Sequence, residues 1–543
     1  MRASLPNPFY YLDNFQQVLD WVFQRHGDLL DEAERAFVAA FADLPKASRA
    51  LLVRMVMRKG ELFRASKLDY AEIGCPHAAA DPLAALGWLD TAPLLSGAQL
   101  FALLNKTELL RAFALTGMSG MRKSELFDHL GERLTGERAL GDWCPALGDR
   151  VFQLCIGDWC ERLRLMFFGN LRQDWSEFVL ADLGIYRYEQ VDFSPAFRAF
   201  HRREDIDAYL HLHRCREAFE RGEPVADVLE AIPREAFTNP WLEARRGKLL
   251  LRLGQQLERQ GELAEALRVH ANNPYAGARE RAIRVLERCD QPEAALELAE
   301  RAAAAPESEQ EAQHLQRIVP RLQRCLGRAS APRQRRATVE RLDLRLALDG
   351  IRVEQAVRDH LSQPQAPVHY VENALLGSLF GLLCWDALFA PLPGAFFHPF
   401  HWAPADLDRP DFYQRRAALF RQCLARLDTD AYRSWIWRTY REKSGIHSAF
   451  VAWGVVGEQL LEQALTCIAP HHLKLIFQRM LTDVRSNRSG LPDLVQFWPA
   501  ERRYRMIEVK GPGDRLQDNQ QRWIEYALRH ELPISVCHVA RAD

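Results

Sequence analysis

The feature that most constrains the fold is a C-terminal pair of strand-like stretches, residues 493–498 and 507–510. Alternate residues of a strand point to opposite faces, so Glu508 and Lys510 project together while their neighbours face a packing layer. The first stretch is rich in branched and aromatic residues, and the polar segment 499–503 between the two contains a proline. These patterns predict a β-hairpin with one polar and one apolar face.

The turn of this hairpin decides which residues face each other. If it is centred between Ala500 and Glu501, Asp493 lies directly opposite Glu508. Like charges opposed on a sheet are destabilising, and two close carboxylates otherwise keep a proton. Carboxylate oxygens are the ligands of hard divalent cations, so the pair predicts a site for Mg²⁺ or Mn²⁺.

Lys510 adds a tunable ammonium beside the two carboxylates. It is one of nine lysines in a chain with 62 arginines, and a guanidinium is too basic to exchange protons. A metal held here would polarise a phosphoryl oxygen and acidify a bound water, while Lys510 could orient that water or neutralise charge on the phosphate. The stretch therefore predicts a metal-dependent phosphodiesterase.

At these residues the chain resembles a known family. Pro492-Asp493, followed after a gap by Glu508-Val509-Lys510, resembles the PD-(D/E)xK nuclease motif. The continuation through Gly511-Pro512-Gly513-Asp514 to Gln520-Gln521-Arg522-Trp523 is similar to the VRR-Nuc domain, and the whole chain resembles the Fanconi-associated nuclease family. The resemblance implies metal ligation by Asp493, Glu508 and the Val509 carbonyl, with Lys510 serving the water.

Glu372 is a lone acid ahead of a strongly apolar helical stretch. It is either a helix-start residue favoured by the helix dipole or a further metal ligand. The segment from Glu372 to Trp385-Asp386 resembles the family's segment with its helical catalytic glutamate, which implies that Glu372 joins the metal site.

Beyond the lysine, the glycines at 511 and 513 predict a sharp turn, with Asp514 as the cap of a helix through Gln520 and Trp523. Gln520 could orient water or substrate, or could only line the surface. A closing strand at 534–539 completes an α/β restriction-endonuclease-like nuclease domain.

Length and composition bound the rest of the chain. At 543 residues several domains are expected. The formal net charge of −1 leaves DNA binding to local basic patches. Eleven cysteines without a repeated framework favour reduced thiols and an intracellular protein. The most apolar run, 374–390, is too short to span a bilayer and predicts a buried helix, so no membrane partner is expected.

Two short helical patterns in residues 94–135 resemble a SAP unit, which implies contact with the DNA backbone. Its cations are Lys106, Arg111, Arg122 and Lys123; the alternative is an ordinary two-helix packing unit. Residues 237–330 contain a faint repeat with a shift of 29 residues, which predicts a TPR-like solenoid that is either a spacer or a site for protein partners.

Two further arginine clusters are candidate DNA contacts. Arg333, Arg335 and Arg336 follow a proline break, and Arg485 and Arg488 shortly precede the acidic site. Guanidinium groups grip phosphate bidentately, although either cluster could simply solvate a surface. The expected domains are an N-terminal helical region (1–93), the SAP-like unit (94–135), a helical region (136–236), the repeats (237–330), a basic linker or helix (331–366) and the nuclease domain (367–543).

The family resemblance implies a structure-specific nuclease that incises 5′-flap, branched or nicked DNA, with 5′-to-3′ exonuclease action and a role in interstrand-crosslink repair. The alternatives are a Holliday-junction resolvase or restriction-type endonuclease, and an inactive DNA-binding scaffold. Eukaryotic family members carry a ubiquitin-binding zinc finger, and no cysteine pattern here matches one. We therefore expect a bacterial protein without a ubiquitin partner, cytoplasmic and nucleoid-associated, or nuclear if the source is eukaryotic.

Overall fold

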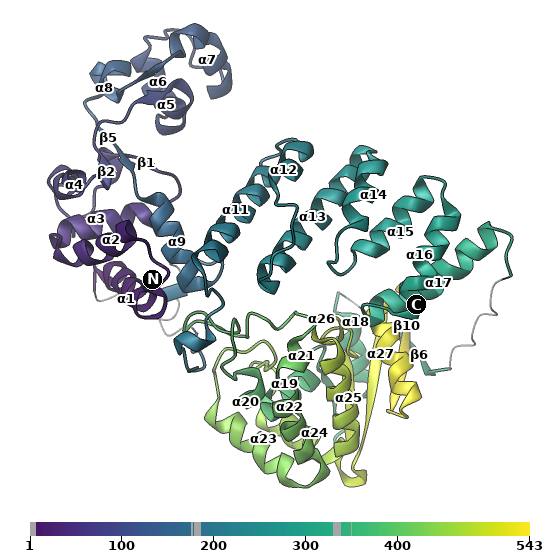
Figure 1. The fold of residues 1–543 in the computed structure, drawn as a ribbon. Helices are drawn as coiled ribbons and strands as arrows, with labels where there is room; N and C mark the ends of the chain where they lie inside the picture. The colour runs from purple at the N-terminus through teal and green to yellow at the C-terminus, as the bar shows by residue number, and fades with distance from the viewer. Residues whose placement is uncertain (1–6, 175–176, 179–185, 330–337, 349, 543) are drawn as a thin grey trace. The chain divides into compact units, whose positions relative to one another are not determined.

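The structure is a computed structural model that describes residues 7–174, 177–178, 186–329, 338–348 and 350–542 (Figure 1). The chain divides into two compact units. The first unit comprises residues 1–185 and 193–206, and the second comprises 186–192 and 207–543. Each unit is described by itself. No described helix is long and apolar enough to cross a membrane.

The first unit begins as a helical layer that packs around a small antiparallel sheet of order β1-β5-β2. These short strands were not predicted from the sequence, because two to four residues carry too little alternation to be distinguished from loop. The elements are α1 (Tyr10–His26), α2 (Glu32–Asp43), α3 (Lys46–Val56), β1 (Leu62–Arg64), α4 (Pro76–Ala85), β2 (Leu89–Asp90), β5 (Val151–Leu154) and α9 (Gly157–Phe168).

The SAP-like part of this unit has its own apolar core, which includes Leu100, Leu109 and Leu126. Asn105 caps one of its helices, because its side chain accepts from the Glu108 amide at 2.9 Å. The elements are β3 (Leu95–Ser96), α5 (Gly97–Leu103), α6 (Lys106–Ala112), α7 (Lys123–Leu130), β4 (Glu137–Arg138) and α8 (Leu140–Trp143).

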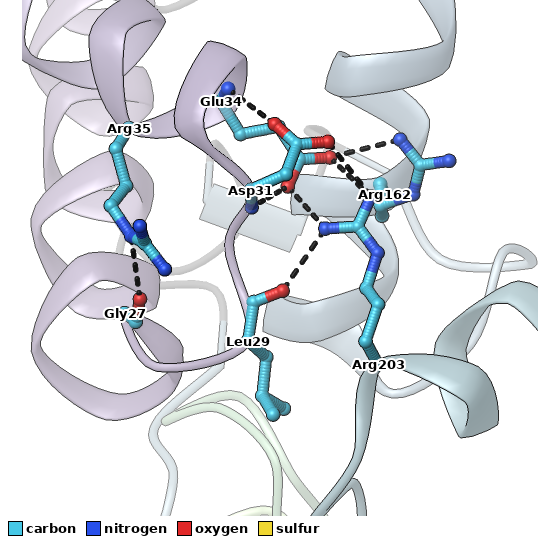
Figure 2. A network of polar contacts seen from close by, with 7 residues as sticks. All are labelled: Gly27, Leu29, Asp31, Glu34, Arg35, Arg162 and Arg203. Carbon is cyan, nitrogen blue, oxygen red and sulfur yellow. Dashed lines mark hydrogen bonds and ion pairs between the residues drawn. The ribbon is translucent and has the colours of Figure 1, made fainter.

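A network of charged residues around the buried Glu34 fixes the start of α2 in the first unit (Figure 2). Asp31 caps the helix by accepting from the Glu34 amide at 2.8 Å, and Glu34 accepts in return from the Asp31 amide at 3.0 Å. Arg162 of α9 lies 2.9 Å from Glu34, and Arg203, the first residue of α11 (Arg203–Glu220), donates to it at 2.5 Å. Glu34, although completely buried, is thus fully paired.

The second unit starts with the predicted solenoid, whose successive helices pack against one another. The predicted shift of 29 residues separates the first residues of α14 and α16, so these two helices are equivalent members of the repeat. Gly254 permits the close approach of α13 to α14, because a Cβ there would lie 2.5 Å from the His270 ring. The helices are α12 (Val225–Ala231), α13 (Pro240–Gln260), α14 (Leu263–Ala271), α15 (Ala278–Arg288), α16 (Pro292–Ala304) and α17 (Glu309–Cys325).

The nuclease part contains a five-stranded mixed sheet of order β6-β10-β9-β8-β7. The predicted hairpin register is confirmed, because Leu494 pairs with Ile507. The pairs β6–β10 and β10–β9 are parallel, whereas β9–β8 and β8–β7 are antiparallel. The strands are β6 (Glu340–Leu346), β7 (Val368–Tyr370), β8 (Leu494–Trp498), β9 (Arg503–Lys510) and β10 (Ile534–Arg541).

Strand β6 corrects the prediction of a basic linker or helix in this region. Leu342, Leu344 and Leu346 alternate with exposed charged residues, and the three leucines pack against the sheet core. This period of two is the pattern of a half-buried edge strand. The prediction of a linker or helix was wrong for residues 340–346, because it rested on the arginines and overlooked the alternation of the leucines.

The helices of the nuclease part surround this sheet, and the apolar run 374–390 forms buried helices as predicted. They are α18 (Val353–Leu361), α19 (Leu375–Leu383), α20 (Trp385–Leu388), α21 (Phe412–Arg415), α22 (Ala417–Ala425), α23 (Ala431–Glu442), α24 (Glu458–Cys467), α25 (Pro470–Thr482), α26 (Val484–Asn487) and α27 (Asp518–Arg529). Short 3-10 turns lie at η1 (Ala65–Lys67), η2 (Gly131–Leu134), η3 (Pro145–Leu147), η4 (Pro195–Phe197), η5 (Arg426–Asp428) and η6 (Pro499–Glu501).

Candidate active site

The β8–β9 hairpin brings the two predicted acids and the lysine together. Asp493 immediately precedes β8, and its Oδ2 accepts from the Val509 amide at 2.8 Å. The Nζ of Lys510 lies 2.8 Å from Oε1 of Glu508. All three side chains are buried, with 7%, 1% and 7% exposure for Asp493, Glu508 and Lys510. The site is thus an enclosed charged cluster at one end of the hairpin.

Burial and mutual repulsion hold a proton on this cluster. Burial is the main reason that the pKa of Glu508 rises to about 8, and the neighbouring Asp493 charge raises it further. Burial also raises the pKa of Asp493 to about 6, against the lowering effect of the Val509 amide. A cation bound between the two carboxylates would replace this proton.

The donor set fits a hard divalent metal. Asp493 and Glu508 are two buried carboxylates that face each other, and the Lys510 ammonium pairs with one of them, Glu508, at 2.8 Å. One ammonium does not balance two buried negative charges, and a divalent cation would supply the missing positive charge. Among the described residues, no three His, Cys, Asp or Glu side chains are already grouped to hold a metal.

Glu372 is the predicted third ligand, and its backbone is fixed beside Asp493 from both sides. The Val371 amide donates to the Asp493 carbonyl at 2.8 Å, and Asn373 Oδ1 accepts from the Leu491 amide at 3.3 Å. Glu372 itself is exposed and lies outside α19, which begins at Leu375. It is therefore not the helix-start residue that the alternative interpretation required.

The carboxylate of Glu372 is engaged by Tyr370, whose hydroxyl donates to it. This bond raises the pKa of the Tyr370 phenol to about 12. The charge of Glu372 also raises the pKa of both Asp493 and Glu508, so its field reaches the cluster.

Glu354, in the first turn of α18, was not identified from the sequence. Its charge raises the pKa of Asp493 and of Tyr370. The preceding residue, Val353, lies against Gly511, where an added Cβ would be 3.2 Å from its Cγ2. The only sequence signal was the amphipathic pattern of 353–361, which shows a helix but not its neighbour.

The segment after Lys510 differs from the prediction in its cap. Asp514 closes the turn by accepting from the Gly511 amide at 2.9 Å, and Gln517 is the residue that precedes α27. Gln520 Oε1 accepts from the Gln517 amide at 2.9 Å. The side-chain oxygen of Gln520 is thus part of a capping box. The side-chain nitrogen, Nε2, is then the group of Gln520 that could contact substrate.

Helix α27 is also attached to the last helix of the solenoid. Arg317 of α17 donates to Asp518 at 2.9 and 2.5 Å, and Gln313 donates to the Asp518 carbonyl at 3.2 Å. Arg479 of α25 pairs with Glu309 at 2.7 Å. The solenoid is therefore more than a distant spacer, because its end supports the helix that follows Lys510.

The predicted DNA contacts lie in different environments. Arg485 is exposed, whereas Arg488 is half-buried and lies 3.6 Å from the Asp408 carboxylate. In the SAP-like part, Lys106 donates to the Ser119 carbonyl at 2.5 Å. Three further cations are placed by their burial: Arg111 and Arg122 are exposed, and Lys123 is half-buried. Arg333, Arg335 and Arg336 lie outside the described residues.

Three family models match the chain. "FAN1, HTH domain" matches residues 9–90, "Fanconi anemia-associated nuclease SAP domain" matches 94–143, and "VRR-NUC domain" matches 428–541. The SAP match coincides with the part that contains α5 to α8. The SAP-like part and the nuclease part, which the family resemblance implied, thus each match a model of this family.

Similar proteins cover the whole chain. A Fanconi-associated nuclease 1 homolog of Pseudomonas aeruginosa is 55% identical over 99% of this chain and 96% of its own length. The human Fanconi-associated nuclease 1 is 24% identical over 98% of this chain and 62% of its own length. A crystal structure described as paFAN1 bound to 2-nt 5′-flap DNA with a gap matches with a TM-score of 0.93 at 55% identity, covering 99% of this chain and 100% of that one.

The hairpin cluster, the helical modules and these similarities agree on one identity. The chain is a DNA-cleaving hydrolase with a metal-dependent VRR-NUC domain, and it belongs to the Fanconi-associated nuclease 1 family.

Proposed function

We propose that this nuclease cuts the phosphodiester backbone of branched DNA that carries a 5′ flap, with Mg²⁺ or Mn²⁺ as the metal. The observation that carries the proposal is the buried pair of Asp493 and Glu508, two carboxylates beside the one ammonium of Lys510, which lies 2.8 Å from Glu508. Such a cluster is costly in a resting protein and is explained by a bound cation.

Asp493, Glu508, the Val509 carbonyl and Glu372 would hold the metal. When bound, the metal would polarise a phosphoryl oxygen and make a bound water more acidic. Lys510 would position the attacking water or balance charge on the phosphate, since its ammonium already lies beside Glu508. The Val509 amide keeps Asp493 oriented, and Gln520 keeps α27 in place while its free amide nitrogen contacts substrate.

The substrate class is supported by the structures that this chain resembles. Two of them, at 55% and 54% identity, are described as bound to 5′-flap DNA with a 2-nt or a 1-nt flap and a gap. Arg485 beside the site and the SAP-like cations Lys106, Arg111, Arg122 and Lys123 would hold the duplex by its phosphates. Arg488, and the arginines 333, 335 and 336, would extend this contact. With 5′-to-3′ exonuclease action, the enzyme would serve interstrand-crosslink repair.

The test compares cleavage of four labelled DNAs: a 5′ flap, a 3′ flap, a Holliday junction and a linear duplex. Each is incubated with Mg²⁺, with Mn²⁺ and with chelator, using the wild type and Asp493→Ala. We expect the 5′ flap to be cut fastest, cutting to require metal, and the variant to be inactive. Arg505→Ala is a suitable control, because Arg505 lies on the same strand as Glu508 and contacts Gln496 and Glu340 rather than Asp493 or Glu508.

Cleavage with chelator, or an undiminished rate in Asp493→Ala, would overturn the mechanism. Preference for the Holliday junction would overturn the substrate assignment and leave the metal site intact.

A further inference from the structure

We infer that the second unit has a stacking platform for an unpaired base of the DNA substrate, built from Tyr186, His447 and Trp402. The Tyr186 and His447 rings are nearly parallel, with centroids 4.6 Å apart and an interplanar angle of 11°. The Trp402 and His447 rings are 5.6 Å apart at 22°. This inference rests on the proposed action on DNA with a single-stranded flap.

The three rings form a short column with His447 in the middle. Tyr186 and Trp402 make no ring contact with each other among the described residues, although both are stacked close to His447. Both rings therefore stack against the same imidazole and are joined through it into one aromatic surface.

The Tyr186 and Trp402 side chains both reach solvent. Tyr186 is 40% exposed and Trp402 is 45% exposed, which makes them two of the few large apolar side chains exposed to this degree. Exposed aromatic side chains that lie together mark a binding surface more often than single scattered ones do. The size and flatness of these two rings suit a nucleobase, which has a π-face whatever its sequence.

The column is held rigidly by the backbone around it. The His447 amide donates to the Arg187 carbonyl at 2.7 Å, and the Ala449 amide donates to the Trp402 carbonyl at 3.0 Å. Arg187 and Ile446 form a β-bridge. Three separate segments of the chain are thus fixed in register, so a base would meet preorganised rings and would not have to order them.

The surroundings also suit a nucleic acid strand. Tyr188 stands edge-on to Phe400, with ring centroids 5.7 Å apart, and widens the aromatic surface. Arg187, the neighbour of Tyr186 in the chain, is exposed, and its guanidinium donates to the Ser444 carbonyl at 3.5 Å. A cation next to stacking rings is the combination that binds a single strand through base and phosphate together.

The platform is within reach of the proposed cleavage site. The segment after His447 is anchored on α19, since Ser378 Oγ donates to the Phe450 carbonyl at 3.3 Å and accepts from the Ala452 amide at 3.0 Å. Ser378 is six residues beyond Glu372, and three of these precede α19, which gives about 15 Å of chain. Adding three extended residues from His447 to Phe450 and the contact through Ser378 gives roughly 30 Å, or about nine stacked nucleotides at 3.4 Å each.

The experiment measures binding without cleavage, in chelator. A 5′-flap DNA with 2-aminopurine at successive flap positions is titrated with the wild type, Tyr186→Ala, Trp402→Ala and Trp402→Phe, and a blunt duplex of the same sequence is titrated in parallel. Phe23→Ala is the matched control, because Phe23 is also an exposed aromatic residue (50%) and lies in the first unit. Thermal melting of each variant shows whether it is folded.

We expect Trp402→Ala and Tyr186→Ala to weaken flap binding roughly 5- to 150-fold, which corresponds to loss of one or both stacked faces. The 2-aminopurine quenching at one flap position should disappear, Trp402→Phe should retain most of it, and blunt-duplex binding should not change. An equal loss on flap and duplex, or no loss in either folded alanine variant, would overturn the platform. Metal-dependent cleavage is followed separately: its absence in a wild type that still quenches 2-aminopurine would contradict the proposed function and not the platform.

Discussion

Two buried glutamates, one in each unit, are held in opposite ways. Glu34 is fully buried and receives bonds from Arg162, Arg203 and the Asp31 amide (Figure 2). Glu508 is 1% exposed and pairs with the Lys510 ammonium at 2.8 Å, but it also faces Asp493, whose negative charge raises its pKa. A completed set of partners indicates a structural charge, whereas an incomplete set indicates a ligand site.

The largest effect is expected from replacing Glu508, the glutamate whose charge is incompletely paired. Glu508→Gln removes a proposed metal-ligand charge, and cleavage of 5′-flap DNA should fall by about 10³-fold or more. The fold should survive, because the repulsion with Asp493 is relieved. Single-turnover cleavage with Mn²⁺ measures the rate, and circular dichroism checks the fold. Retained activity would contradict the assignment of Glu508.

The same substitution at Glu34, the glutamate whose charge is fully paired, should lower stability and leave cleavage unchanged. Glu34→Gln removes the buried carboxylate that pairs with Arg162 and Arg203 and should destabilise the first unit by roughly 3–5 kcal/mol. Urea unfolding followed through the aromatic residues of that unit measures the loss. Cleavage per folded molecule should stay close to wild type. A thousandfold loss of cleavage in a folded Glu34→Gln protein would remove the contrast between the two residues.

The pH dependence of the metal-free protein sharpens the contrast further. The pKa of Glu508 is raised from 4.5 to about 8, so the folded state holds a proton that the unfolded state releases. The associated stability is present below about pH 4 and is lost as pH rises through 8. Asp493, raised to about 6, contributes in the same direction at lower pH.

We therefore expect the metal-free wild type to lose roughly 2–4 kcal/mol between pH 4.5 and pH 8 relative to Glu508→Gln. Chemical denaturation in chelator at several pH values measures this difference. Saturating Mn²⁺ should abolish it, because the metal replaces the proton. A wild type and a variant with parallel pH profiles would show that Glu508 is ionised in the resting protein.

The smallest expected effect concerns Tyr370. Tyr370→Phe removes the hydroxyl that donates to Glu372 and should weaken Mn²⁺ binding by up to about fivefold, the value of one hydrogen bond. Calorimetric titration of the metal-free protein measures the affinity. Tighter binding in the variant would instead show that Tyr370 competes with the metal for Glu372.

The sequence was sufficient for the catalytic hairpin and insufficient for its surroundings. The register of β8 with β9 followed from a proline-containing turn and a period of two, both local properties. Glu354 could not be found this way, because its approach to Asp493 depends on how α18 packs near Gly511. Tyr370 was likewise missed, since its bond to Glu372 depends on the rotamers of two side chains. Strand β6 could have been predicted from the sequence, because its leucines alternate with charged residues.

The pairing of β7 with β8 has a consequence for how the enzyme folds. Tyr370 lies opposite Leu494, so one antiparallel contact closes a loop that contains all the helices from α19 to α26. Loop-closure entropy and high contact order make such a pairing slow to form. The helical insert should therefore become compact first, and Glu372 and Asp493 should meet late. A nascent or partly unfolded chain would then be unable to cut DNA until its last strands have paired.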